Sequence, residues 1–228
     1  MDLPFDLVAT DLACRRAGRR VFAGLSFTLR RGEAALLRGP NGSGKSTLLR
    51  ILAGLLPAEA GDARLGTVSL AGDRDSFMEQ VVYAGHLDAV KPQLGVAENL
   101  ATWAALYGTA EPEARAFAAL ERLGLSRIAD FPAAYCSAGQ KRRLGLARLL
   151  VIDRPLWLLD EPTVSLDVAA VETFAGLVRA HVAAGGLAIA ATHLPLDLGP
   201  GPEIAMDAPV AATAALPEDD PFLQGAWT

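Results

Sequence analysis

The segment LLRGPNGSGKSTLLRILAGLL, residues 36–56, decides the fold because it joins an apolar run to a strongly helical one through three glycines and a lysine. It contains the pattern G-x-x-x-x-G-K-[ST], in which small residues let backbone N–H groups close around phosphate oxygens. A helix is expected to begin at Lys45 and to end near Gly54 and Pro57. The segment therefore predicts a phosphate-binding loop that opens a helix. The residues of this loop are Gly39, Pro40, Asn41, Gly42, Ser43, Gly44, Lys45 and Ser46.

Composition indicates one globular unit. The 228 residues are 51% hydrophobic, which is enough to bury one substantial core. A formal net charge of -5 disfavours nucleic acid as the main partner, because binding to a phosphate backbone needs a basic face. Cys14 and Cys136 lack metal-ligand spacing, which favours a reduced, cytosolic setting. No window approaches a membrane span, so a role at a membrane would need spans from other chains.

Three kinds of segment follow one another along the chain. Residues 7–37 and 64–70 hold short β-rich pieces, which predict a small sheet leading into the core. Residues 96–123 have a purely helical period and predict an all-helical insertion. A βα alternation then resumes, with apolar runs typical of parallel strands covered on both faces. Its expected elements are a helix over 138–150, a strand over 156–159, a helix over 168–184 and a strand over 187–191. After residue 198, a Pro-, Ala- and acid-rich segment predicts a short terminal element and a poorly ordered tail.

Two acidic residues follow the strand expected over 156–159. In a phosphate-loop enzyme, an aspartate here can hold Mg²⁺ and the adjacent glutamate can polarise the attacking water. Asp160 and Glu161 fit these two roles, and the Ser46 hydroxyl would complete the metal site. Lys45 would neutralise the β- and γ-phosphates. His193 follows the next parallel strand at the same sheet edge, so it is expected to reach a γ-phosphate.

A second anion site is predicted by YCSAGQKRRLGLARLL, residues 135–150. Ser137 is a plausible N-cap, with free N–H groups behind it at Gly139 and Gln140. A head-to-tail homodimer that forms when ATP binds would use both phosphate sites. Each nucleotide would then lie between the phosphate loop of one subunit and the Ser-Ala-Gly-Gln turn of the other.

Five motifs, in this order and within one domain, resemble the ATP-binding subunit of an ABC transporter. They are the phosphate loop at 39–46, CSAGQ at 136–140, LWLLDEP at 156–162, SLD at 165–167 and His193. The resemblance implies a P-loop NTPase of ABC type with ATP and Mg²⁺ as cofactors. Its fold would be α/β, with a RecA-like parallel-sheet core, a small antiparallel β subdomain and an all-helical subdomain. It also implies an ATP-binding domain over 5–198, a helical subdomain over about 88–150 and a C-terminal tail over 199–228. Thr47 and Asp167 join the nucleotide-binding residues by this resemblance.

A narrower resemblance is to the ATPase subunit of the cytochrome c maturation system, a heme exporter. It rests on YAGHLDAVKPQLGVAENLATW, SAGQKRRLGLARL and PLWLLDEP. This family implies integral membrane subunits as partners and a peripheral place on the cytoplasmic face of the bacterial inner membrane. It also shares His86, where most ABC relatives have a glutamine that approaches Mg²⁺, so His86 is a candidate metal contact.

Two other positions depart from the general ABC pattern. Cys136 stands where the signature motif usually begins with leucine, but Ser137 and Gly139 are retained, so phosphate binding is expected to survive. The N-terminal loop has no aromatic residue where an adenine-stacking tyrosine is common. Arg16 could stack on the base instead.

Two other functions compete with an ATPase that drives a membrane component. A non-transport ABC ATPase acting on DNA or ribosomes is disfavoured by the acidic balance. A regulatory nucleotide-binding module without turnover is disfavoured by the complete set of catalytic residues. Residues 141–143 are expected to form either a solvated basic face or a contact with a partner or phosphate. His181 is expected either to lie on the surface or to pack against neighbouring residues.

Overall fold

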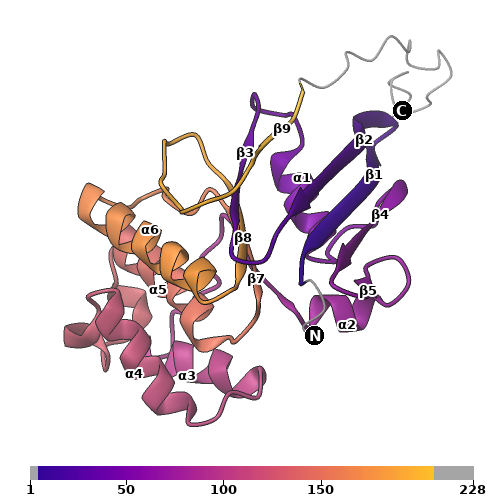
Figure 1. The fold of residues 1–228 in the computed structure, drawn as a ribbon. Coiled ribbons are helices and arrows are strands. Elements are labelled where there is room, and N and C mark those ends of the chain that lie inside the picture. Colours follow the sequence, from indigo (N-terminus) through magenta and orange to yellow (C-terminus); the bar gives the residue numbers. More distant parts are fainter. Residues whose placement is uncertain (1–4, 208–228) are drawn as a thin grey trace, which may run out of the picture.

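The computed structural model describes residues 5–207, which form two sheets and the helices around them (Figure 1). The predicted α/β fold, with a parallel core, a small antiparallel sheet and a helical part, is confirmed. Most of the tail expected over 199–228 lies outside the described residues.

The central sheet has five parallel strands in the order β6-β7-β8-β3-β9. Every connection between its neighbouring strands is therefore a crossover, as parallel pairing requires. Its carboxyl edge carries the phosphate loop and the acidic pair. The strands are β3 (Ala34–Arg38), β6 (Val81–Ala84), β7 (Leu156–Asp160), β8 (Leu187–Ala191) and β9 (Glu203–Ala205).

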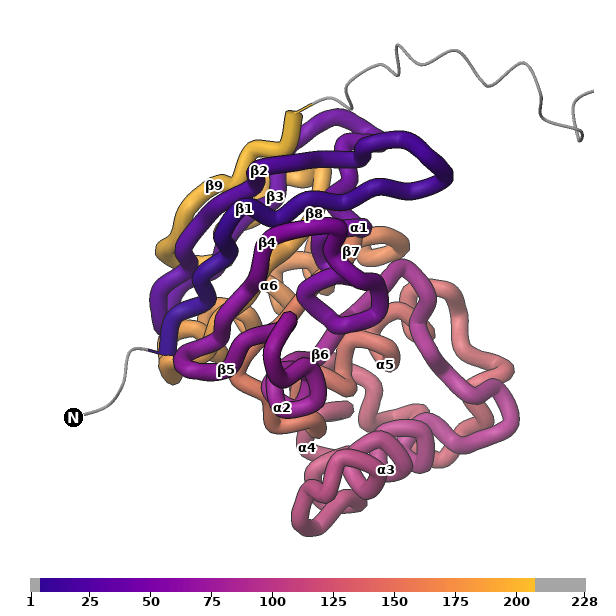
Figure 2. The backbone as a smooth tube through the Cα atoms, turned by 90° about the vertical axis from the view of Figure 1, so that its right-hand side faces the viewer, coloured from indigo at the N-terminus to yellow at the C-terminus, as the bar shows by residue number. Residues whose placement is uncertain are grey.

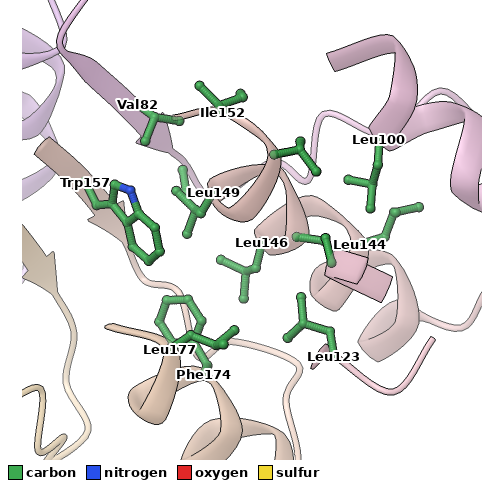
Figure 3. Packing of buried hydrophobic residues seen from close by; sticks show 14 of the residues in the cluster. Val82, Leu100, Leu123, Leu144, Leu146, Leu149, Ile152, Trp157, Phe174 and Leu177 are labelled. Atoms are coloured by element: carbon green, nitrogen blue, oxygen red, sulfur yellow. The ribbon is translucent and has the colours of Figure 1, made fainter. Parts of the chain in front are cut away.

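Both faces of this sheet are buried, which explains why β7 reads as an unbroken apolar run. Leu156 and Leu158 belong to the hydrophobic cluster on the face that α1 (Lys45–Leu52) covers. Trp157 and Leu159 belong to the cluster on the opposite face, which α6 (Val168–Ala183) covers. Figure 3 shows Trp157 in this second cluster, close to side chains of α5 (Ala138–Val151) and α6.

The second sheet is antiparallel, in the order β2-β1-β4-β5. Helix α1 lies between the two sheets (Figure 1), and its Leu48, Leu49 and Leu52 are fully buried in a cluster that draws on both. The phosphate-loop helix thus has apolar neighbours on two sides. The remaining elements here are β1 (Leu7–Arg16), β2 (Arg19–Leu29), β4 (Ala60–Leu65), β5 (Val68–Ser69) and α2 (Arg74–Met78).

A helical layer packs beside the central sheet, on the side away from the β1–β2 hairpin (Figure 2). It consists of α3 (Val96–Leu106), α4 (Pro112–Arg122) and α5, with 3₁₀ turns over Ser126–Ile128 and Ala133–Tyr135. Pro112 occupies the first turn of α4, where its missing N–H costs nothing. Among residues 5–207, no helix combines the length and the apolar character that crossing a bilayer requires.

The short element expected after residue 198 is strand β9, at the edge of the central sheet next to β3. Carbonyl oxygens of Pro200 and Pro202 accept hydrogen bonds from Ala34 and Leu36, and Met206 N–H donates to Arg38. Ile204 and Met206 are buried in the core. The chain therefore stays part of the folded unit to residue 206, beyond the expected boundary at 198.

Candidate nucleotide site

The phosphate loop spans the turn between β3 and α1. Gly44 takes the N-cap position of α1 with φ of 99°, a left-handed conformation that favours glycine. At Gly39, a side chain would collide with the carbonyl of Met206. Helix α1 begins at Lys45, so the unpaired N–H groups of its first turn face the loop, as anion binding requires.

Lys45 is the first residue of α1 and is 8% exposed. Its ammonium group donates hydrogen bonds to the carbonyl oxygens of Gly39, at 2.7 Å, and Pro40, at 3.0 Å. The charge is thus held at the mouth of the loop, within reach of an anion that the backbone N–H groups bind.

A cleft of about 560 Å³ opens over the loop, within the size range of small-molecule sites. It brings together predicted residues from the loop, from the end of β7 and from the end of β8. Arg16, the expected base contact, also lies on its wall. The full lining consists of Arg16, Ala17, Val21, Asn41, Gly42, Gly44, Lys45, Ser46, Thr47, Glu161 and His193.

Asp160 is 2% exposed and has both carboxylate oxygens engaged. Ser46 Oγ donates to its Oδ1 at 2.8 Å, and Tyr83 Oη donates to its Oδ2 at 2.9 Å. Burial raises the pKa of Tyr83, which keeps its hydroxyl a donor. The sequence analysis missed Tyr83, although the apolar run VVYA could have marked the strand that carries it.

Glu161 and His193 meet across the cleft, with Oε1 and Nε2 3.4 Å apart. Glu161 has φ of 48°, an uncommon conformation for a residue with a side chain, and its N–H donates to Ala191 O at 2.8 Å. Arg38, also missed by the sequence analysis, donates from Nη1 to Thr192 O at 3.0 Å and so braces the residue before His193.

The residues at this edge fit Mg²⁺. Ser46 Oγ and the Asp160 carboxylate are adjacent hard oxygen donors, of the kind that Mg²⁺ prefers. The described residues contain no cluster of three or more His, Cys, Asp or Glu side chains suited to a metal. Mg²⁺ is usually bound through one or two protein oxygens together with waters and substrate phosphates.

The second predicted anion site does not line the cleft. Ser137 is exposed and caps α5: its Oγ accepts from Gln140 N–H at 3.2 Å, while Gln140 Oε1 accepts from Ser137 N–H at 2.8 Å. Gly139 follows in the first turn. Asp167 caps α6 by accepting from Ala170 N–H. The structure thus keeps this turn apart from the phosphate loop of the same chain.

His86 does not line the cleft either. It is exposed in the loop that follows β6. The basic run at 141–143 is also not simply a solvated face, because Arg142 is 4% exposed.

Comparisons with known proteins identify the family of this chain. Residues 22–164 match the family model described as ABC transporter. A cytochrome c biogenesis ATP-binding export protein CcmA from Cereibacter sphaeroides is 52% identical, over 95% of this chain and 97% of the relative. The protein of the same name from Ruegeria pomeroyi is 52% identical, over 94% and 97%.

Solved structures show the same fold. An ATP-binding subunit of an ABC transporter matches with a TM-score of 0.74 and 27% identity, over 82% of this chain and 80% of that one. A dimeric ATP-binding cassette in a post-hydrolysis state with ADP and Pi matches with a TM-score of 0.73 and 22% identity, over 82% and 88%. The chain belongs to the ABC transporter ATPases, within the family of cytochrome c biogenesis ATP-binding export proteins.

Proposed function

We propose that this chain hydrolyses ATP to drive an ABC membrane complex for cytochrome c biogenesis, by heme export or by release of a heme chaperone. One observation carries the catalytic part of the proposal. The phosphate loop, Glu161 and His193 line a single cleft, and Asp160 is hydrogen-bonded to Ser46 of that loop.

The residues of the cleft divide the chemistry among them. The loop N–H groups and Lys45 bind the phosphates and offset their charge. Glu161 accepts a hydrogen bond from the attacking water and orients it toward the γ-phosphate. His193, next to Glu161, donates to a γ-phosphate oxygen. Mg²⁺, held by Ser46 and Asp160, supplies charge neutralisation on the phosphates when bound.

The proposed working unit is a head-to-tail homodimer on ATP. Ser137, Gly139 and Gln140 open α5 but do not line the cleft of their own chain. The capping box engages the N–H groups of Ser137 and Gln140, which leaves those of Ala138 and Gly139 in the first turn for an anion. An anion at this turn would come from a second subunit. Asp167, exposed at the N-cap of α6, would lie at the same interface. The dimeric state of a solved ATP-binding cassette supports this arrangement by analogy.

The proposed partners are integral membrane subunits, with this chain peripheral on the cytoplasmic face of the bacterial inner membrane. The printed name of the relatives, an export protein, supports partners of this kind. Nucleic acid is not expected among them.

A paired measurement tests the proposal. Glu161→Gln should retain ATP and accumulate dimer while hydrolysis falls, whereas Lys45→Ala should lose ATP affinity. In cells that lack the chain, wild type should restore holo-cytochrome c and both variants should not. Near-normal turnover of Glu161→Gln would remove Glu161 from its role. An unchanged holo-cytochrome c yield after deletion of the chain would refute the role in cytochrome c biogenesis.

A further inference from the structure

We propose that Arg142 is the positioning residue for Glu161, and that through it the helical layer sets the rate of ATP hydrolysis without changing how tightly ATP binds. The inference rests on the proposed role of Glu161. The Arg142 guanidinium is buried between α5, the loop after β6 and the end of β7.

All three guanidinium nitrogens of Arg142 donate hydrogen bonds. Three of the acceptors are successive backbone carbonyls at the end of β7: Glu161 O at 2.6 Å from Nη2, Pro162 O at 3.1 Å from Nε, and Asp160 O at a longer 3.4 Å. A planar, rigid fork of this kind fixes the positions of its acceptors better than a flexible ammonium group does.

The other end of the guanidinium holds the loop after β6. Nη1 donates to Gly85 O at 2.9 Å and to Asp88 Oδ1 at 3.1 Å. Helix α5 is tightly packed here, because a Cβ at Gly145 would lie 2.7 Å from Asp88 O. This loop leads into α3, so Arg142 joins two segments of the helical layer to the catalytic end of β7.

The backbone of Glu161 needs such support. Its φ of 48° is costly for a residue with a side chain and persists only where the surroundings fix it. Its N–H is fixed by Ala191 O on β8, and its carbonyl by Arg142. Without Arg142, the buried carbonyls would lose their donors and the peptide after Glu161 could relax. Because the carboxylate follows the backbone, its distance to the attacking water would change.

Burial of the arginine is better explained by this geometry than by stability. Among residues 5–207, Asp88 is the only carboxylate that accepts from Arg142. The free-energy cost of desolvating the guanidinium offsets much of the gain from this one ion pair. The bonds instead make the catalytic backbone and the loop after β6 move together.

Arg142→Lys is the direct test, because lysine keeps the charge but cannot reach five acceptors at once. Turnover should fall about 10- to 100-fold, the size of effect expected when a catalytic group is displaced by about 1 Å. The ATP dissociation constant, measured by equilibrium binding, should change less than about 3-fold, because the phosphate loop is intact.

Arg143→Lys is the matched control. Arg143 is the next residue of α5 and donates to Leu123 O at 3.1 Å, away from the catalytic backbone. Its turnover should stay within about 2-fold of wild type, because a single peripheral hydrogen bond is lost. Equal losses in Arg142→Lys and Arg143→Lys would overturn the proposal.

A double-mutant cycle separates positioning from a general structural effect. If Arg142 acts through Glu161, Arg142→Lys should cause little further loss in the Glu161→Gln background. The same fold-loss in both backgrounds, or a weaker ATP affinity at unchanged turnover, would overturn the proposal. Full turnover of Glu161→Gln alone would instead refute the proposed role of Glu161.

If Arg142→Lys does not fold, Asp88→Ala replaces it. This variant removes one acceptor at the partly exposed end of the guanidinium and leaves the arginine in place. Turnover should fall about 3- to 10-fold, less than in Arg142→Lys, because four of the five hydrogen bonds of Arg142 remain. Turnover equal to wild type in Asp88→Ala would overturn the proposal.

Discussion

Tyr83→Phe should loosen Asp160, the aspartate proposed to hold Mg²⁺, without disturbing the phosphate loop. The substitution removes only the hydroxyl that donates to Asp160 Oδ2 at 2.9 Å, and it keeps the ring. Asp160 is 2% exposed, so water replaces the lost donor poorly. Hydrogen bonds to charged groups contribute about 1.5–3 kcal/mol to stability. In a domain of this size, each kcal/mol shifts the melting temperature by about 2–4 °C, so the variant should melt about 3–12 °C lower.

The same variant should weaken the Mg²⁺-dependent part of ATP binding. The Asp160 carboxylate keeps Ser46 as a donor but loses its second anchor, so it can rotate away from the metal position. We expect ATP affinity in EDTA to stay within about 2-fold of wild type, while the gain on adding Mg²⁺ shrinks about 5-fold or more, the equivalent of about 1 kcal/mol. Thermal melts give the melting temperature, and equilibrium ATP binding with and without Mg²⁺ gives the Mg²⁺-dependent gain in affinity.

Tyr107→Phe provides the control for removing a hydroxyl. Tyr107 is 39% exposed and does not line the nucleotide cleft. Its melting temperature should shift by less than about 1 °C, as is usual for exposed positions. A melting temperature of Tyr83→Phe equal to that of wild type, or an equal loss of ATP affinity in EDTA and in Mg²⁺, would refute the proposed role of the Tyr83 hydroxyl.

Three further predictions concern the interface, coupling and pH. Mixing Lys45→Ala with Ser137→Arg chains should restore one usable site per heterodimer, and a mixture with no ATPase activity would contradict the head-to-tail dimer. His86→Ala should lower holo-cytochrome c yield more than basal phosphate release, with His86→Gln milder; equal losses would make His86 a plain active-site residue. Burial lowers the pKa of His181, which stacks on Trp157 with ring centroids 3.9 Å apart. As pH falls below about 6.5, His181 becomes protonated in the unfolded chain but stays neutral in the folded chain. The free energy of unfolding should therefore be highest above pH 6.5 and should decrease as pH falls toward the folded pKa. Urea unfolding should show this fall in wild type and a flatter profile in His181→Phe; identical profiles would refute it.

Long segments with one clear period were predictable from the sequence. The helix expected over 138–150 is Ala138–Val151, and the strand expected over 156–159 is Leu156–Asp160. The ABC-type ATPase assignment and its cytochrome c branch are confirmed by the comparisons. Both rest on motifs whose residues are close in sequence, so the local pattern carries the information.

The type and pairing of short elements held by distant partners were not predicted. Strand β6 has four residues, and a short apolar run cannot be told from a buried helical piece by periodicity. Strand β9 has three residues in a segment rich in proline and glycine, and it exists because β3 offers a free edge. In each case the decisive partner is a strand elsewhere in the chain.

The site residues that the sequence analysis missed have a common feature: they bind backbone groups or side chains of other elements at the edge of the sheet. Arg38 holds Thr192 O, and Arg142 holds Glu161 O, so the ends of β8 and β7 are each braced by an arginine from another element. In a sequence, these arginines count as surface charges. In the fold, Arg142 is 4% exposed and Arg148, with a pKa lowered by burial, is 7% exposed.

The burial of these arginines affects what the net charge indicates about binding to nucleic acid. The formal net charge of -5 treats every cation alike, but a buried guanidinium bonded to carbonyl groups cannot meet a phosphate backbone at the surface. Part of the basic run at 141–143 is committed to the catalytic strand end, so it offers less of a basic patch than its letters indicate. The burial of Arg142 therefore adds a second reason, beside the net charge, to expect weak binding to nucleic acid.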